Sequence, residues 1–131
     1  AITLPVGRVS AEAERLIADP ALAPLFGPQA LAEATLATDM GGDRWFGTID
    51  RLLVEPDRVL AVDFKSNRTI PDRPEDVPEG ILRQMGGYAA MLETVYPARR
   101  VETAILWTVA GRLMPLPDPL IRAALVRAGS A

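Results

Sequence analysis

An aspartate and a lysine interrupt an apolar run in the stretch AVDFKSNR, residues 61–68. Asp63 and Lys65 are two residues apart, so on a β-strand both side chains point to the same face of a sheet. An acid and a lysine on one face can hold a cation and position a water molecule, or they can form an ordinary surface ion pair. The neighbouring strand bears on which interpretation is favoured.

A second acid is expected opposite Asp63, because a tight turn joins this run to the strand before it. The turn EPDR, residues 55–58, has proline at the position that type I turns favour. If Val54 pairs with Val59, Asp50 faces Asp63, and such facing residues have Cβ atoms about 4.5–5.5 Å apart. A β-bulge would shift this register.

Two facing carboxylates repel each other, and a divalent cation between them turns that cost into a binding site. Mg²⁺ and Mn²⁺ prefer such hard oxygen ligands, and the backbone carbonyl of Phe64 offers one more. A bound metal polarises a phosphate and lowers the pKa of water, while Lys65 positions that water or offsets charge on the phosphate. The pattern indicates metal-dependent phosphodiester hydrolysis, with a surface ion pair as the alternative.

The composition excludes several other kinds of site. The chain has 131 residues, a formal net charge of −3, and neither cysteine nor histidine. Disulfides, zinc–thiolate sites and histidine-based triads are therefore excluded within this sequence. No apolar run reaches the roughly 18 residues of a membrane span, and no signal-peptide pattern opens the sequence. A free-standing nucleic-acid binder is usually basic, so we expect a partner to supply much of any affinity for phosphates.

The elements expected around these residues alternate between strands and helices, which predicts an α/β fold with a mixed sheet. The expected strands are residues 30–38, 45–54, 59–65, 101–109 and, more weakly, 112–116. The expected helices are residues 11–19, 79–97 and 119–128. Gly86 and Gly87 lie in the middle of the second helix at a cost of about 1 kcal/mol each relative to alanine. We therefore expect this helix to lie very close to another element.

Three motifs resemble those of a known nuclease superfamily. GTID at 47–50, VDFK at 62–65 and QMGGY at 84–88 are similar to the Asp, (Asp/Glu)-x-Lys and Gln-x-x-x-Tyr motifs of the PD-(D/E)XK superfamily, in its RecB-like branch. The closer similarity is to the C-terminal nuclease domain of AddA, the helicase–nuclease subunit of the bacterial AddAB complex. FGTIDRLLV, VDFKSNR, YP at 96–97 and AILWT at 104–108 follow that domain's pattern in order, over about residues 21–126. The resemblance implies a restriction-endonuclease-like core, in which a three-stranded meander, a helix and further strands form a mixed sheet flanked by helices.

The resemblance also implies roles for individual residues. Asp50 and Asp63 would be metal ligands, Lys65 the catalytic lysine, and Gln84 and Tyr88 residues that line the active site from the following helix. Positions four apart share a helix face, which supports the last pair independently. Core packing remains an alternative for the tyrosine, and a solvated position for the glutamine.

Three further residues have two interpretations each. The family often has an acid before the GTID strand near the metal, which makes Glu33 a candidate ligand; the alternative is an exposed acid on a poorly defined strand. Asn67 and Arg68 follow the lysine directly and are either contacts to DNA phosphates or solvated loop residues.

The chain departs from the family pattern in one respect. The RecB-like branch usually has a histidine ligand on an upstream helix, and this chain contains no histidine. Either the helix that carries it was left out with the rest of a larger parent, or the chain is a natural variant that lost the ligand. In both cases we expect an incomplete set of metal ligands and reduced activity of the isolated chain. Because no methionine opens the sequence, we interpret residues 1–131 as one nuclease domain of a larger helicase–nuclease, with an N-terminal helix at 1–19 and the catalytic core at 20–131.

By resemblance, the function is that of a Mg²⁺-dependent exonuclease domain, with Mn²⁺ able to substitute. It would cut single DNA strands delivered by attached helicase domains during double-strand break repair. The expected partners are those helicase domains and an AddB-type subunit, in the bacterial cytoplasm and away from any membrane. Two alternatives remain: a catalytically inactive docking or DNA-binding module of the same fold, and a stand-alone exonuclease or restriction-type nuclease.

Overall fold

A computed structural model describes Leu16 and residues 18–129. Five strands form a single sheet in the order β1-β2-β3-β4-β5. The strands are β1 (Ala30–Met40), β2 (Asp43–Val54), β3 (Arg58–Lys65), β4 (Arg100–Trp107) and β5 (Arg112–Leu116). The helices are α2 (Glu79–Val95) and α3 (Asp118–Gly129), with short 3₁₀ helices η1 (Ala23–Phe26) and η2 (Pro74–Asp76). The predicted mixed sheet is confirmed, whereas most of the helix predicted at residues 11–19 lies outside the described residues.

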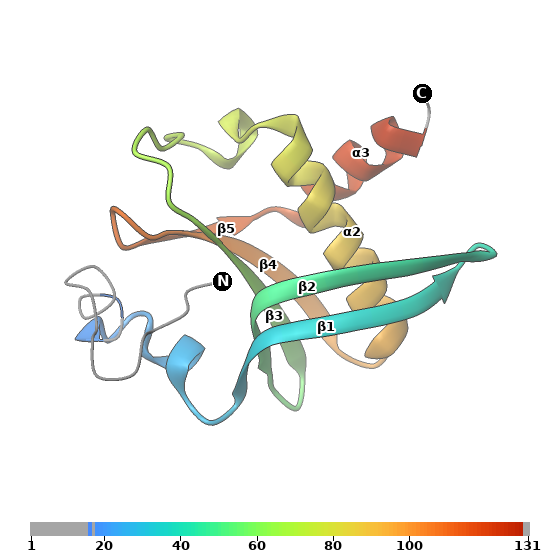
Figure 1. Cartoon of the computed structure of the whole chain (residues 1–131), viewed down its shortest axis with the longest axis horizontal. Coiled ribbons are helices and arrows are strands. Elements are labelled where there is room, and N and C mark those ends of the chain that lie inside the picture. The colour runs from blue at the N-terminus through green and yellow to red at the C-terminus, as the bar shows by residue number, and fades with distance from the viewer. Residues whose placement is uncertain (1–15, 17, 130–131) are drawn as a thin grey trace.

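The sheet contains both antiparallel and parallel neighbours. Strands β1, β2 and β3 form an antiparallel meander, β3 and β4 run parallel, and β5 returns antiparallel to β4. Parallel neighbours cannot be joined by a tight hairpin, and α2 supplies the required crossover between β3 and β4. Figure 1 shows α2 and α3 together on one side of the sheet.

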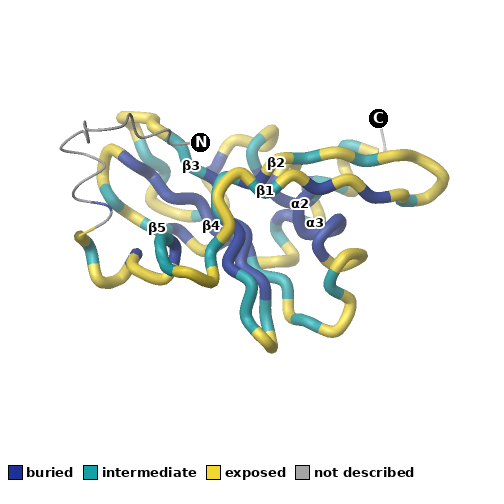
Figure 2. The backbone as a smooth tube through the Cα atoms, turned by 60° about the horizontal axis from the view of Figure 1, so that its bottom comes forward, coloured by how far each residue is buried: buried dark blue, intermediate teal, exposed yellow. Residues whose placement is uncertain are grey.

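Strand β3 is buried on both faces because elements cover both sides of the sheet. Val59 and Ala61 belong to the core shared with α2 and α3, whereas Leu60 and Val62 pack in a second core with Leu25 of η1. The backbone in Figure 2 is accordingly coloured as buried through the centre of the sheet. This arrangement explains a continuous apolar run in place of the apolar–polar alternation of a half-exposed strand.

The prediction from the two helix glycines holds for one of them. A Cβ atom added at Gly86 would lie 2.3 Å from the backbone oxygen of Ile121 on α3, so only glycine permits this close approach of the two helices. A Cβ atom at Gly87 would meet its nearest atom, in Trp45, at 3.8 Å, which is an ordinary contact. The predicted close approach of this helix to another element is therefore confirmed, and Gly86 is the glycine that it requires.

Two predicted boundaries were too late by two residues. Helix α2 ends at Val95, not at residue 97, because Pro97 disfavours the helical conformation for Tyr96 before it. Strand β4 ends at Trp107 because β3, its partner, ends at Lys65. None of the helices in the described part of the chain is long and apolar enough to span a membrane.

Beyond Arg51, towards the tip of the β1–β2 hairpin, β2 is no longer paired with β3. Strands β1 and β2 pair along their length except where the register sets Glu33 opposite Asp50. Glu33 has a φ of 50°, in the left-handed region that residues other than glycine rarely adopt. The β2–β3 ladder stops at the same point, since its last pair joins Arg51 and Val62. Residues 34–49, which we call the hairpin arm, cross α2, with Leu36 and Ile49 buried in the core, and only the tip of the arm projects from the body of the protein (Figure 1).

Candidate active site

The register predicted for the β2–β3 hairpin is confirmed by four consecutive pairs, from Val54 with Val59 to Arg51 with Val62. Asp50 and Asp63 come next in this register, where the ladder ends. Asp50 accepts a hydrogen bond from the N–H of Phe64, the residue after Asp63, so the two acids are neighbours, and each shifts the pKa of the other. The structure therefore brings together the two acids that the sequence analysis paired.

Asp50 lies where β2 separates from β3, and its side chain bridges the gap. The backbone N–H of Phe64 donates a hydrogen bond of 2.8 Å to Asp50 Oδ2. The N–H and the carbonyl of one strand residue point to the same side, so the Phe64 carbonyl also faces this gap. This orientation is the one that the predicted carbonyl ligand requires.

Asp63 and Lys65 lie on the face of β3 that α2 and α3 cover. Asp63 is only 5% exposed, and its Oδ2 lies 2.8 Å from the Nζ atom of Lys65. This ion pair lacks hydrogen-bond geometry, since Asp63 Oδ2 has no hydrogen-bond partner within the described part of the chain. A buried carboxylate oxygen without such a partner is costly and has spare capacity for a ligand.

The two acids have opposite pKa shifts. Burial raises the pKa of Asp63, and the neighbouring Asp50 raises it further, against the lowering effect of Lys65. Burial also disfavours the charged form of Asp50, but hydrogen bonds to its carboxylate, led by the one from the Phe64 N–H, hold its pKa below the ordinary value. Two carboxylates that share a site resist a second negative charge, and a divalent cation would remove that resistance.

These residues fit a divalent metal ion, although the two acids alone do not form a full set of ligands. Across residues 18–129 and Leu16, no three Asp, Glu, His or Cys side chains are grouped so that they could hold a metal ion. Glu33 is exposed and does not join the two aspartates in such a group. Oxygen atoms from the Phe64 carbonyl and from water would complete the coordination of Asp50 and Asp63.

Gln84 and Tyr88 lie on one face of α2, as their spacing predicts. The Tyr88 hydroxyl donates a hydrogen bond of 2.9 Å to the carbonyl of Thr48, and Gln84 Nε2 donates one of 3.0 Å to that hydroxyl. Burial and the charges of Asp63 and Asp50 raise the pKa of Tyr88, so it keeps the proton that it donates. Tyr88 is 7% exposed and also packs in the core, so both interpretations of this residue apply together.

Two backbone-anchoring contacts had not been predicted. The N–H and the Oγ1 of Thr108 donate hydrogen bonds of 2.8 and 3.2 Å to the carbonyl of Lys65, which fixes the end of β3. The carbonyl of Thr48 accepts the hydrogen bond from Tyr88. The only signal for either was the position of each threonine, one inside GTID and the other at the end of AILWT.

A solved structure shares this architecture. The chain is similar to the crystal structure of a candidate exonuclease from Eubacterium rectale, with a TM-score of 0.59 and 15% sequence identity. The similarity covers 88% of this chain but 48% of the other, so the chain spans about half the length of that protein. At this identity the likeness shows the fold alone, which is an α/β fold with a restriction-endonuclease-like core.

The family is shown by the sequence itself. The sequence profile of the PD-(D/E)XK nuclease superfamily matches residues 9–120, most of the chain. The chain therefore belongs to the PD-(D/E)XK nuclease superfamily, and its membership supports nuclease activity in general. No curated protein matches the chain.

Proposed function

We propose that this chain is a metal-dependent deoxyribonuclease domain with its active site at the end of the β2–β3 ladder. Asp50 and Asp63 are the proposed metal ligands, and Lys65 is the proposed catalytic lysine. One observation carries the proposal: Asp63 is 5% exposed, has an oxygen without a hydrogen-bond partner among the described residues, and lies beside the ammonium group of Lys65. Buried carboxyl groups with shifted pKa values occur more often at functional sites than elsewhere in a protein.

Mg²⁺ is the proposed ion, and Mn²⁺ would substitute for it. Asp50, Asp63 and the carbonyl of Phe64 would hold the ion. When bound, the ion polarises the scissile phosphate and lowers the pKa of a water molecule. Hard carboxylate and carbonyl oxygens are the ligands that both ions prefer.

Lys65 and the residues around it would handle the substrate. Its ammonium group donates hydrogen bonds to the attacking water or to phosphate oxygens, where negative charge develops. Thr108 holds the Lys65 backbone in place through two hydrogen bonds to its carbonyl. Arg68, three residues later, is exposed and has no ion-pair or hydrogen-bond partner within the described residues, so its guanidinium is available to a DNA phosphate.

The proposal extends to the setting in which the domain works. The order of FGTIDRLLV, VDFKSNR and AILWT supports an exonuclease domain of AddA type that cuts single DNA strands delivered by helicase domains. In that setting residues 1–131 are one nuclease domain of a larger protein, with an AddB-type partner, in double-strand break repair in the bacterial cytoplasm. Hydrolysis would leave 5′-phosphate and 3′-hydroxyl ends.

A second candidate function is a docking or DNA-binding module that has lost catalysis. Only two acids meet at the proposed site in the described residues, and the net charge of the chain is −3. Both observations fit a domain that keeps the sheet but does not cut DNA.

Titration with Mn²⁺ separates the two candidates. Calorimetry on the 131-residue chain is expected to show binding that Asp63→Asn removes, since this substitution keeps the shape of the side chain but not its charge. Asp57→Asn, at an exposed acid in the β2–β3 turn, is the matched control and should bind as the wild type does. Equal affinity of wild type and Asp63→Asn would disprove the metal site. Binding without cleavage of single-stranded DNA would favour the docking or DNA-binding module.

A further inference from the structure

The position of Asp50 is not fixed by the pairing of the strands around it. The β2–β3 ladder ends one residue before it reaches Asp50, and the β1–β2 ladder omits the pair that would join it to Glu33. A metal site shared between β2 and β3 needs the distance between its two acids to be fixed. The side chain of Asp50 bridges the gap to the Phe64 N–H, and a contact to the β2 backbone is needed as well to hold the strand where the ladders stop.

Helix α2 supplies that contact two residues away from Asp50. The Tyr88 hydroxyl donates its hydrogen bond to the Thr48 carbonyl at 2.9 Å, and Gln84 Nε2 donates to the same hydroxyl at 3.0 Å. The bond ties the base of the hairpin arm to α2, a helix already packed on α3 and on the sheet.

Gly47 shows how closely β2 lies on the helix at this point. A Cβ atom there would be 2.7 Å from Cε of Met91 and 2.9 Å from Cε1 of Tyr88, both on α2. The aromatic ring of Tyr88 therefore packs against β2 at Gly47, while its hydroxyl binds the carbonyl of the next residue, Thr48. Thr48 and Asp50 are separated by Ile49 alone, which is fully buried in the same core.

We propose that Tyr88 is a positioning residue: its hydrogen bond to the Thr48 carbonyl sets the place of Asp50 relative to Asp63. Gln84 acts through Tyr88, because its amide orients the hydroxyl toward Thr48. In this role neither side chain has to touch the substrate or the metal. The inference rests on the proposed function only in the statement that Asp50 and Asp63 share a metal ion.

The test measures Mn²⁺ affinity and backbone protection in the same variants of the 131-residue chain. Tyr88→Phe keeps the ring that packs on Gly47 and removes only the hydroxyl. We expect about tenfold weaker Mn²⁺ binding, as for other groups that orient metal ligands. In metal-free protein, amide hydrogen exchange of the peptide covering residues 47–51 should become faster. Tyr96→Phe, at the other tyrosine of the chain, is the matched control and should change neither quantity.

A double-mutant cycle tests the indirect role of Gln84. Gln84→Ala alone should weaken Mn²⁺ binding by less than Tyr88→Phe does. In the Tyr88→Phe background the same substitution should have no further effect, because the hydroxyl that it orients is gone. A further loss of affinity in that background would disprove the indirect role and indicate direct contact of Gln84 with the site.

The outcomes distinguish this inference from the proposed function. Unchanged Mn²⁺ affinity in Tyr88→Phe would overturn the positioning role, whether or not hydrogen exchange becomes faster, because the change at Thr48 would not reach Asp50. If the wild-type chain binds no Mn²⁺, the proposed metal chemistry fails. Faster exchange across residues 47–51 in Tyr88→Phe would then still support the hydrogen bond as what holds this segment of β2, and unchanged exchange would overturn it.

Discussion

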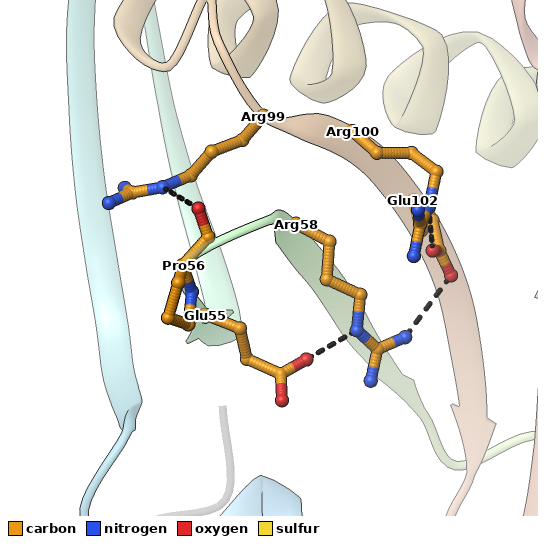
Figure 3. Close-up of polar contacts among 6 residues, drawn as sticks. All are labelled: Glu55, Pro56, Arg58, Arg99, Arg100 and Glu102. Carbon is orange, nitrogen blue, oxygen red and sulfur yellow. Dashed lines mark hydrogen bonds and ion pairs between the residues drawn. The ribbon is translucent and has the colours of Figure 1, made fainter.

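At the N-terminal end of β3, Arg58 forms ion pairs with Glu55 of the preceding turn and with Glu102 of β4, the latter at 3.2 Å (Figure 3). Arg100 binds the other oxygen of Glu102 at 2.7 Å. At the C-terminal end of the same strand, Asp63 is paired with Lys65 and has a second acid, Asp50, as a charged neighbour. The two ends of one eight-residue strand therefore use charge in different ways.

The acids at the two ends of β3 have opposite pKa shifts. Hydrogen bonding to Arg100 lowers the pKa of Glu102, which is partly exposed and paired with two arginines. Burial raises the pKa of Asp63, despite its lysine. At the N-terminal end, the arginine and glutamate charges that tie the turn to the strands offset one another near the surface. At the proposed site, the carboxyl group of Asp63 is buried, and its Oδ2 lacks a hydrogen bond among the described residues. A buried acid beside a second acid lowers stability and is typical of an active site.

The largest expected effect comes from removing the cation at the C-terminal end. Lys65→Ala should reduce cleavage of single-stranded DNA by about 10²–10³-fold, the usual cost of losing one group that stabilises transition-state charge. Arg58→Met, at the cation of the other end, should cleave within about twofold of wild type because it acts only on stability. Initial rates on a 5′-labelled oligonucleotide with Mg²⁺ would measure both. Similar losses in the two variants would show that the two ends do not differ in function.

Arg58→Met should lower the stability of the fold, although it leaves cleavage nearly unchanged. Arg58→Met keeps the aliphatic stem but leaves Glu55 without its ion-pair partner, and we expect the free energy of unfolding to fall by about 1 kcal/mol. Urea denaturation at low and high salt would measure it, and the difference from wild type should shrink in high salt. Arg99→Met serves as a control, since Arg99 forms no ion pair among the described residues; its guanidinium donates a long hydrogen bond of 3.4 Å to the Pro56 carbonyl (Figure 3) and lies over the ring of Tyr96. An equal loss in the control would show that the ion pairs of Arg58 add nothing.

The sequence predicted the pairing of the two acids because that pairing depends on local rules. The turn EPDR and the period of two in a strand set the β2–β3 register, and the structure has this register in all four pairs of the ladder. The spacing of Gln84 and Tyr88 likewise follows from the helix repeat. The match of the superfamily profile to residues 9–120 confirms the family that the motifs indicated.

Other features depend on how α2 crosses the sheet, which no short pattern records. The bond from Tyr88 to Thr48 joins residues 40 positions apart, and its acceptor is a backbone carbonyl that any residue type would provide. The separation of β2 from β3 at Asp50 is equally invisible, because the apolar pattern continues through Ile49. Gly86 and Gly87 look alike in sequence, yet only Gly86 meets α3 at close range. At the tip of the hairpin arm, Gly41 and Gly42 both adopt the positive φ that tight hairpin turns require.

The smallest expected effect is a pH dependence at the N-terminal end of β3. The pKa of Glu102 is lowered by its hydrogen bond with Arg100 and by the charge of Arg58, so its ionised form favours the folded state. Its contribution is present above the unfolded-state pKa of about 4.5 and is lost as the pH falls through the lower folded-state value. Because Glu102 is partly exposed, this contribution should stay below about 1 kcal/mol. Glu102→Gln should therefore be less stable than wild type at pH 7, and the difference should shrink as the pH falls below the unfolded-state value and vanish once Glu102 is protonated in the folded protein. Urea denaturation of both proteins across this range measures the difference, and a gap that stays constant with pH would mean that packing, not ionisation, accounts for the role of Glu102.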